Sequence, residues 1–205
     1  MTNRFARGLA FGVIALGCAA AAGAQTPPAA PATADVTVVA KPTYVSIPME
    51  IMVDRPAAEV WKRIGKYCDI GEWFRIPCTI TQGTDGEFGA VRSVANEVLV
   101  AKTELSYTYT QPVRAGRPYD LYHGTLEARP VTATTSKLIY TLVYDNSMLA
   151  DDAAKAADRA RRTATFTTAL HNMKILAEGG TLPPAPPRAG GAGGAGGAGG
   201  AGRGN

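Results

Sequence analysis

Apolar and polar positions alternate in several parts of the chain, and this pattern predicts β-strands. A period of two sends successive side chains to opposite faces of a sheet. The clearest runs are residues 44–53, 105–110, 122–129 and 137–145. Three shorter candidates, punctuated by glycine-containing turns, are residues 78–82, 90–94 and 96–100. In the long runs the polar sets must face solvent, so the tyrosines are predicted to point inward.

Two short helical patterns follow the first strand. Asp54 suits an N-cap, and Pro56 suits the first turn of a helix because its missing N–H is not needed there. The apolar face that follows contains Ala57, Val60, Trp61 and Ile64. Residues 68–74 form a second short helix or turn. Trp61 and Trp73 are interpreted as core anchors rather than ligand contacts, because both belong to apolar helix faces.

A long helix is predicted over residues 151–177, which contain no glycine or proline. Asp151 and Asp152 favour its N-terminus through the helix dipole. At about 1.5 Å per residue it is roughly 40 Å long, enough to lie across a whole sheet. Its apolar stripe contains Phe166, Leu170, Met173 and Ala177, and Thr163 and Arg159 continue that stripe toward the N-terminus.

The N-terminal residues 1–24 have the pattern of a secretory signal peptide. Basic residues precede the apolar run 9–18, and Ala22–Ala24 fits an A-x-A cleavage site. The expected product is periplasmic or secreted after cleavage near Ala24. Two alternatives stay open, an uncleaved anchor and a lipoprotein modified at Cys18.

Beyond the leader, composition divides the chain into three parts. Residues 25–42 are rich in alanine and proline and are predicted to form an extended linker. Residues 179–205 are rich in proline, glycine and alanine and cannot bury enough apolar surface to offset their ordering entropy, so disorder is expected. A single domain is therefore predicted within residues 43–178.

Export leaves Cys68 and Cys78 as the cysteines of the mature chain. Two cysteines in an oxidising compartment favour a disulfide. The alternative is a pair of buried free thiols. A metal site is not expected, because the two histidines, His123 and His171, lie far from the cysteines in sequence. Both histidines are predicted to be exposed.

The formal charge of +4 is not concentrated in a run that would follow nucleic acid, so no nucleic-acid partner is expected. Arg159, Arg161 and Arg162 lie on the last helix, and Arg114 and Arg117 lie in a loop. These arginines are interpreted as a solvated face, with weak association with the anionic cell envelope as the alternative. No catalytic triad or phosphate loop is present. We expect a monomer without a cofactor.

Several short motifs, taken in order, resemble the START/SRPBCC superfamily of helix-grip, birch-pollen-allergen-like proteins, and within it the polyketide cyclase/dehydrase-like branch. The resemblance covers about two-thirds of the chain. Its motifs are Asp54–Trp61, Gly89–Arg92, Glu97–Leu99, Leu105–Tyr107, Tyr122–Leu126 and Leu170–Leu176.

The resemblance implies an α+β helix-grip fold. A curved seven-stranded antiparallel sheet would surround the long C-terminal helix, with two short helices after the first strand and an apolar cavity between sheet and helix. Family members bind lipids, sterols, polyketides or hormones there. A gate-like loop is expected near Ala95–Asn96 and a latch-like loop near Arg114–Tyr119. The expected ligand-lining residues are Arg92, Val94, Glu97, Tyr107, Tyr109, Tyr122, Tyr140 and, on the long helix, Phe166.

Three functions remain open at this point. The first is an exported binding or carrier protein for a small hydrophobic or aromatic molecule. The second is a cyclase- or dehydratase-like enzyme, in which Arg92 holds a ligand carboxylate and Glu97 acts as a general base. The third is an envelope interaction protein whose tyrosines fill its core. Arg92 and Glu97 are also interpreted as a structural ion pair at the cavity rim.

Overall fold

The computed structural model describes residues 41–114 and 116–184. The predicted signal peptide, the lipidation alternative at Cys18, nearly all of the predicted linker and most of the predicted tail lie outside the described residues, so these assignments stay predictions. Within the predicted tail, Leu182 packs against the core. The carbonyl of Pro183 accepts a hydrogen bond from Arg75.

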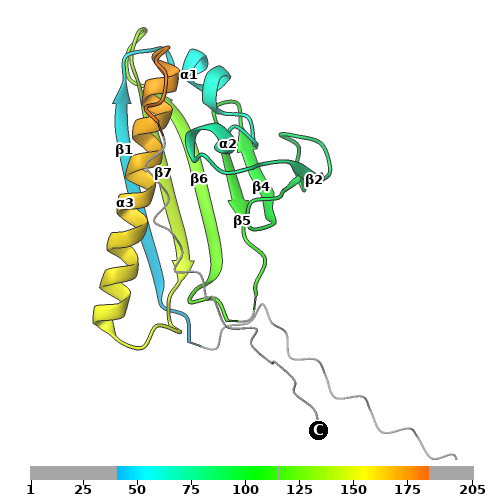
Figure 1. Cartoon of the computed structure of the whole chain (residues 1–205), viewed down its shortest axis with the longest axis vertical. Helices are drawn as coiled ribbons and strands as arrows, with labels where there is room; N and C mark the ends of the chain where they lie inside the picture. The colour runs from blue at the N-terminus through cyan, green and yellow to red at the C-terminus, as the bar shows by residue number, and fades with distance from the viewer. Residues whose placement is uncertain (1–40, 115, 185–205) are drawn as a thin grey trace, which may run out of the picture. The chain divides into compact units, whose positions relative to one another are not determined.

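The fold is α+β, with a seven-stranded antiparallel sheet and a long C-terminal helix, which confirms the predicted helix-grip architecture (Figure 1). Its elements are β1 (Tyr44–Val53), α1 (Ala57–Ile64), α2 (Ile70–Trp73), β2 (Ile80–Gln82), β3 (Val91–Arg92), β4 (Glu97–Thr103), β5 (Ser106–Thr110), β6 (Asp120–Pro130), β7 (Ser136–Asp145) and α3 (Asp152–Ala177). The strand order is β1-β7-β6-β5-β4-β3-β2. Figure 1 shows α3 lying lengthwise along β1 and β7.

The side-chain alternation in the long strands gives the orientation that the sequence predicts. In β6, Tyr122, Gly124, Leu126 and Ala128 are buried, and His123 on the opposite face is exposed. His171 is exposed as well. The inward set on β7 includes Tyr140 and Tyr144, both fully buried. The tyrosines therefore belong to the interior, as a period of two requires.

The start of α1 differs from the prediction. Pro56, not Asp54, occupies the N-cap position, and no side chain caps the helix. The backbone N–H of Asp54 instead donates to Glu178 Oε1 at 2.9 Å, just beyond the end of α3. Because Pro56 sits at the boundary itself, Asp54 lies too far from the first turn to reach its free N–H groups.

The buried stripe of α3 also differs from the prediction. Phe166, Leu170 and Met173 are buried as expected, but toward the N-terminus the stripe continues through Arg162 and Asp158. Arg159 is exposed. A spacing of four residues back from Phe166 leads to these two charged residues. The interpretation of Arg162 as part of a solvated face is therefore wrong, because its neighbours supply a charge partner inside the protein.

A disulfide joins Cys68 and Cys78, with Cα atoms 5.5 Å apart, and confirms the predicted pairing. It encloses α2 and the loop that follows. Trp73 in this segment is fully buried, as predicted, and its carbonyl accepts a hydrogen bond from Asn172 of α3 at 2.9 Å. The disulfide is compatible with an oxidising compartment.

Candidate functional site

A cavity of about 200 Å³ lies between α3, the strands β4 to β6 and the segment that follows α2. Its inner wall is formed by buried residues and its outer rim by partly exposed ones. The buried lining residues are Ile70, Glu97, Tyr109, Tyr122, Arg162 and Phe166, and the rim residues are Phe74, Ile76, Val94, Ala95 and Gln111. The lining combines aromatic and aliphatic side chains with the polar groups of Glu97, Gln111 and Arg162, a mixture that small-molecule sites use for binding and for orientation.

Five of the eight residues expected to line a ligand site lie on this cavity. They come from β4, β5, β6, α3 and the turn before β4, and they are Val94, Glu97, Tyr109, Tyr122 and Phe166. The other three are buried but do not line it: Arg92 and Tyr140 lie in the interior, and Tyr107 lines a different groove. Tyr140 packs on Phe166 with ring centroids 4.7 Å apart, so it supports the wall rather than forming it.

Two tyrosines of the interior are hydrogen-bonded to each other. The hydroxyl groups of Tyr109 and Tyr140 lie 2.8 Å apart. Burial raises the pKa of both phenols, so both stay neutral at ordinary pH. Gly124, which faces Tyr109 across β5 and β6, leaves room for that ring, because an added Cβ would lie 2.4 Å from it. This glycine in an alternating strand is a sequence signal of a close approach.

Arg92 and Glu97 form a fully buried ion pair. Arg92 Nε donates to Glu97 Oε2 at 2.6 Å, and Arg92 Nη1 donates to the carbonyl of Tyr67 at 2.6 Å. Gln111 Nε2 donates to Glu97 Oε1 at 2.8 Å. The alternative of a structural pair at the rim is correct in its pairing and wrong in its position, because Arg92 is 0% exposed and Glu97 3%.

Burial and the neighbouring groups shift the pKa values of this pair. Burial raises the pKa of the Glu97 carboxyl, and Arg92 and Gln111 act against that rise. Burial also acts to lower the pKa of Arg92, but Tyr107 and Glu97 outweigh it, and the guanidinium stays charged. The Arg92 guanidinium lies over the rings of Tyr67 and Tyr109 at 4.3 and 4.7 Å. Its charge is thus compensated on its edge and on its faces.

A second buried charge cluster lies on α3 and was missed by the sequence reasoning. Asp158 accepts hydrogen bonds from Arg162 Nε and from the Tyr144 hydroxyl, both at 2.8 Å, and forms an ion pair with the exposed Arg161. Burial acts to raise the pKa of Asp158, but these donors outweigh it, so the pKa is lowered. The i, i+4 spacing of Asp158 and Arg162 was the signal available in the sequence.

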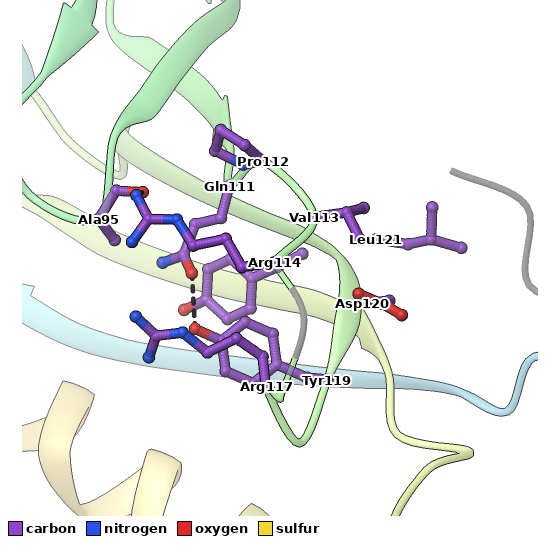
Figure 2. A pocket seen from close by; sticks show the side chains of 10 residues that line it. Ala95, Gln111, Pro112, Val113, Arg114, Arg117, Tyr119, Asp120 and Leu121 are labelled. Atoms are coloured by element: carbon purple, nitrogen blue, oxygen red, sulfur yellow. Dashed lines mark hydrogen bonds between the residues drawn. The ribbon is translucent and has the colours of Figure 1, made fainter. Parts of the chain in front are cut away.

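The gate-like and latch-like segments lie close together (Figure 2). They adjoin the cavity, because Ala95 and Gln111 line both the cavity and the small space between the two segments. Arg114 Nη2 donates to the carbonyl of Ala95 at 3.0 Å, and the Tyr119 hydroxyl donates to Gln111 Oε1 at 2.7 Å. Only about 10 Å³ of space remains between these residues, so the two loops are in contact. Ala95 and Asn96 both have positive φ, a strained conformation for residues other than glycine.

A separate groove of about 560 Å³ lies at the end of α1, beside the β4–β5 hairpin. It is lined by Trp61, Tyr107 and the 63%-exposed Phe88, among others. Trp61 is only half buried and packs against Tyr107 with centroids 5.6 Å apart. This groove shares no lining residue with the cavity under α3, so the two are separate surfaces.

Within the described residues, no helix combines the length and apolarity needed to cross a membrane. The described part of the chain also brings together no group of three or more residues of the types that bind metal ions.

Comparison with known proteins gives similarity in structure alone. No protein-family model and no curated protein matches the chain. Among solved structures, XoxI of Bacillus cereus superposes with a TM-score of 0.52 at 19% identity, over 63% of this chain and 92% of that protein. A protein of Nitrosospira multiformis gives 0.50 at 23%, over 64% and 94%. The ZhuI aromatase/cyclase of Streptomyces sp. R1128 gives 0.50 at 15%, over 68% and 100%.

These similarities agree with the predicted resemblance. The chain has a helix-grip fold, which it shares with a polyketide aromatase/cyclase of known structure. At these sequence identities the proteins share a fold, but the chemistry of the cavity depends on the residues that line it in this chain.

Proposed function

We propose that this chain is an exported protein that binds a compact hydrophobic, aromatic molecule in the cavity under α3. The observation that carries the proposal is the cavity itself, with Phe166 and Tyr122 in its wall and Phe74 at its rim. Apolar ring faces supply the area that is buried on binding, and phenol hydroxyls orient the ligand. A core filled by its own tyrosines would leave no such space beside Tyr109 and Tyr122.

The size of the cavity limits the ligand. About 200 Å³ is slightly larger than an apolar cavity that accepts a benzene ring and smaller than most drug-sized pockets. One ring or two fused rings fit, with polar substituents at the rim. Larger ligands would require the contact between Arg114 and Ala95 to open.

Uptake of a neutral two-ring probe tests this proposal. 2-Naphthamide should bind the purified protein in a calorimetric titration. Val94→Trp, which fills the rim, should weaken binding at least tenfold. Phe88→Ala, in the separate groove, is the matched control and should leave binding unchanged. Binding that depends on Phe88 and not on Val94 would move the site to the groove, and no binding at all would contradict the proposal.

Export is part of the proposal and is supported by the leader pattern and by the Cys68–Cys78 disulfide. Expression of the full chain in a Gram-negative host, followed by fractionation and N-terminal sequencing, should give periplasmic protein that begins at Gln25. A cytoplasmic product that retains Met1 would contradict it. A lipid-modified N-terminus at Cys18 would replace the soluble form by a membrane-anchored one.

A second candidate function is cyclisation of a polyketide-like substrate in the same cavity. The observation that favours it is the Glu97 carboxyl, which lines the cavity and whose pKa is raised by burial. A carboxylate of raised pKa is suited to remove the acidic proton between two carbonyl groups, which starts an aldol condensation that releases water.

Incubation with a short linear β-polyketone tests this candidate. The enzyme hypothesis predicts a cyclic product that is lighter by one water molecule and a rate that Glu97→Gln abolishes. Gln111→Leu, which removes one hydrogen bond to Glu97 and leaves its carboxyl in place, should slow the reaction much less. Stoichiometric binding of the polyketone without any product would contradict the enzyme hypothesis and would support the binding function only.

A further inference from the structure

We propose that Arg162 is the anion-binding residue of the cavity, so that the natural ligand is an aromatic molecule carrying a carboxylate or a similar compact anion. The inference rests on the proposed binding function and adds the charge of the ligand to it. Its basis is a buried guanidinium at the cavity wall with an unused donor.

The hydrogen bonds of Arg162 are incomplete. Its Nε donates to Asp158 Oδ2 at 2.8 Å, but its Nη2 has no hydrogen-bond partner among the residues that the structure describes. The residue is only 6% exposed. Buried donors of a charged group are costly when unsatisfied, so an acceptor brought by a ligand would be stabilised there.

The charges around Arg162 also leave room for an anion. The single carboxylate of Asp158 faces two guanidinium groups, those of Arg162 and Arg161. This cluster therefore carries one net positive charge. The Arg92–Glu97 pair is balanced one to one. An incoming carboxylate is attracted by the first cluster and gains nothing from the second.

Three aromatic rings surround the Arg162 guanidinium. Its central carbon lies 4.3 Å from the ring centroid of Tyr144, 4.5 Å from that of Tyr119 and 5.4 Å from that of Tyr122. A guanidinium suits the oxygens of a carboxylate, and the Tyr122 ring beside it suits the aromatic part of the same ligand.

Arg92, the other buried arginine, does not offer this. It does not line the cavity and is 0% exposed. Its Nη2, like that of Arg162, has no hydrogen-bond partner among the described residues, but it lies 2.6 Å from Glu97 Oε2, which balances its charge. Its Nε donates to the same oxygen, and its Nη1 donates to the Tyr67 carbonyl. We therefore assign the binding of the ligand carboxylate to Arg162 and not to Arg92.

A pair of probes of equal shape tests the inference. 2-Naphthoate and 2-naphthamide differ mainly in charge, and the protein should bind the carboxylate more tightly by about tenfold to a hundredfold. The double variant Asp158→Leu/Arg162→Met replaces both buried charges by apolar groups of similar size, which usually preserves folding. It should bind both probes equally. Arg159→Gln, which removes an exposed charge from the same helix, should keep the preference.

The outcomes separate this inference from the binding function. Equal binding of both probes by the unmodified protein would overturn the anion site and leave the binding function standing. A preference for the carboxylate that survives in the double variant would also overturn it, since the anion would then be held elsewhere. Failure of both probes to bind would overturn the two together. A melting curve for each variant confirms that the compared proteins are folded.

Discussion

Two buried arginine–carboxylate pairs face the interior of this protein, one from the sheet and one from the long helix. Arg92 and Glu97 form hydrogen bonds with one another, with the Tyr67 carbonyl and with Gln111, and in this pair only the carboxylate lines the cavity. Arg162 and Asp158 share one hydrogen bond, and in this pair the arginine lines the cavity, with its Nη2 unpaired among the described residues.

Burial of a charge therefore does not by itself mark a ligand contact. The sheet pair is balanced in charge and its arginine does not line the cavity, which is the arrangement of a structural element. The helix pair has a surplus of positive charge because Asp158 is shared with Arg161. The same residue types therefore take different roles according to the balance of their charges and to whether the arginine lines the cavity.

The largest expected effect is on stability at the sheet pair. Arg92→Met leaves Glu97 buried with only Gln111 as a partner, and should lower the free energy of unfolding by about 3–5 kcal/mol in urea denaturation. Arg162→Met leaves Asp158 with Arg161 and Tyr144, and should cost only about 1–2 kcal/mol.

The control for this contrast is Arg92→Met/Glu97→Leu, which removes both charges and should recover much of the loss. Equal losses for the two single variants would mean that the pairs do not differ as described. A double variant no more stable than Arg92→Met would show that packing, not the uncompensated charge, causes the loss.

A smaller loss of stability is expected when the disulfide is removed. This loss should be coupled to the Arg92–Glu97 pair and not to the Arg162–Asp158 pair. Cys68→Ser/Cys78→Ser opens a loop with a sequence separation of 10 and should cost about 2–3 kcal/mol. Tyr67, whose carbonyl binds Arg92, is the neighbour of Cys68. We therefore expect the disulfide loss to be non-additive with Arg92→Met and additive with Arg162→Met, measured by double-mutant cycles. Additivity with Arg92→Met together with coupling to Arg162→Met would contradict the structural link between the disulfide and Arg92.

The smallest effect is the pH dependence of the two carboxyls, which should have opposite signs. The pKa of Asp158 is lowered in the fold, so its contribution to stability is present above about pH 4 and is lost as the pH falls further. The pKa of Glu97 is raised, so the fold loses stability as the pH rises through that pKa. Unfolding curves of Asp158→Asn and Glu97→Gln from pH 3 to 7 measure both. For each variant, the measured quantity is its free energy of unfolding minus that of the unmodified protein. If this quantity changes with pH in the same direction for both variants, the direction of one of the two pKa shifts is wrong.

Most of the fold could be predicted because its strands alternate strictly. Strand β1 begins and ends where the alternation predicts, and α3 differs by one residue at its start. The short strands were less predictable. Strand β3 comprises only Val91 and Arg92, because the chain turns at Ala95 and Asn96 with positive φ. Asparagine adopts this conformation more often than most residues, but alanine does not indicate it.

The site was predictable only on the sheet side. Strand alternation places Tyr109 and Tyr122 inward without any knowledge of the partners. The burial of Arg162 was not predicted, because charged residues on a helix usually face solvent. It depends on Asp158 and on three tyrosine rings from distant parts of the chain. Such compensation arises from tertiary contacts, so a single helix pattern does not reveal it.

A crystal structure of the protein with 2-naphthoate would show both where the ligand binds and which residue holds its carboxylate. The proposal predicts the ring system in the cavity between Phe166 and Tyr122, with a carboxylate oxygen within hydrogen-bond distance of Arg162 Nη2. A ligand in the groove beside Phe88, or a cavity that stays closed to the probe at saturating concentration, would contradict it.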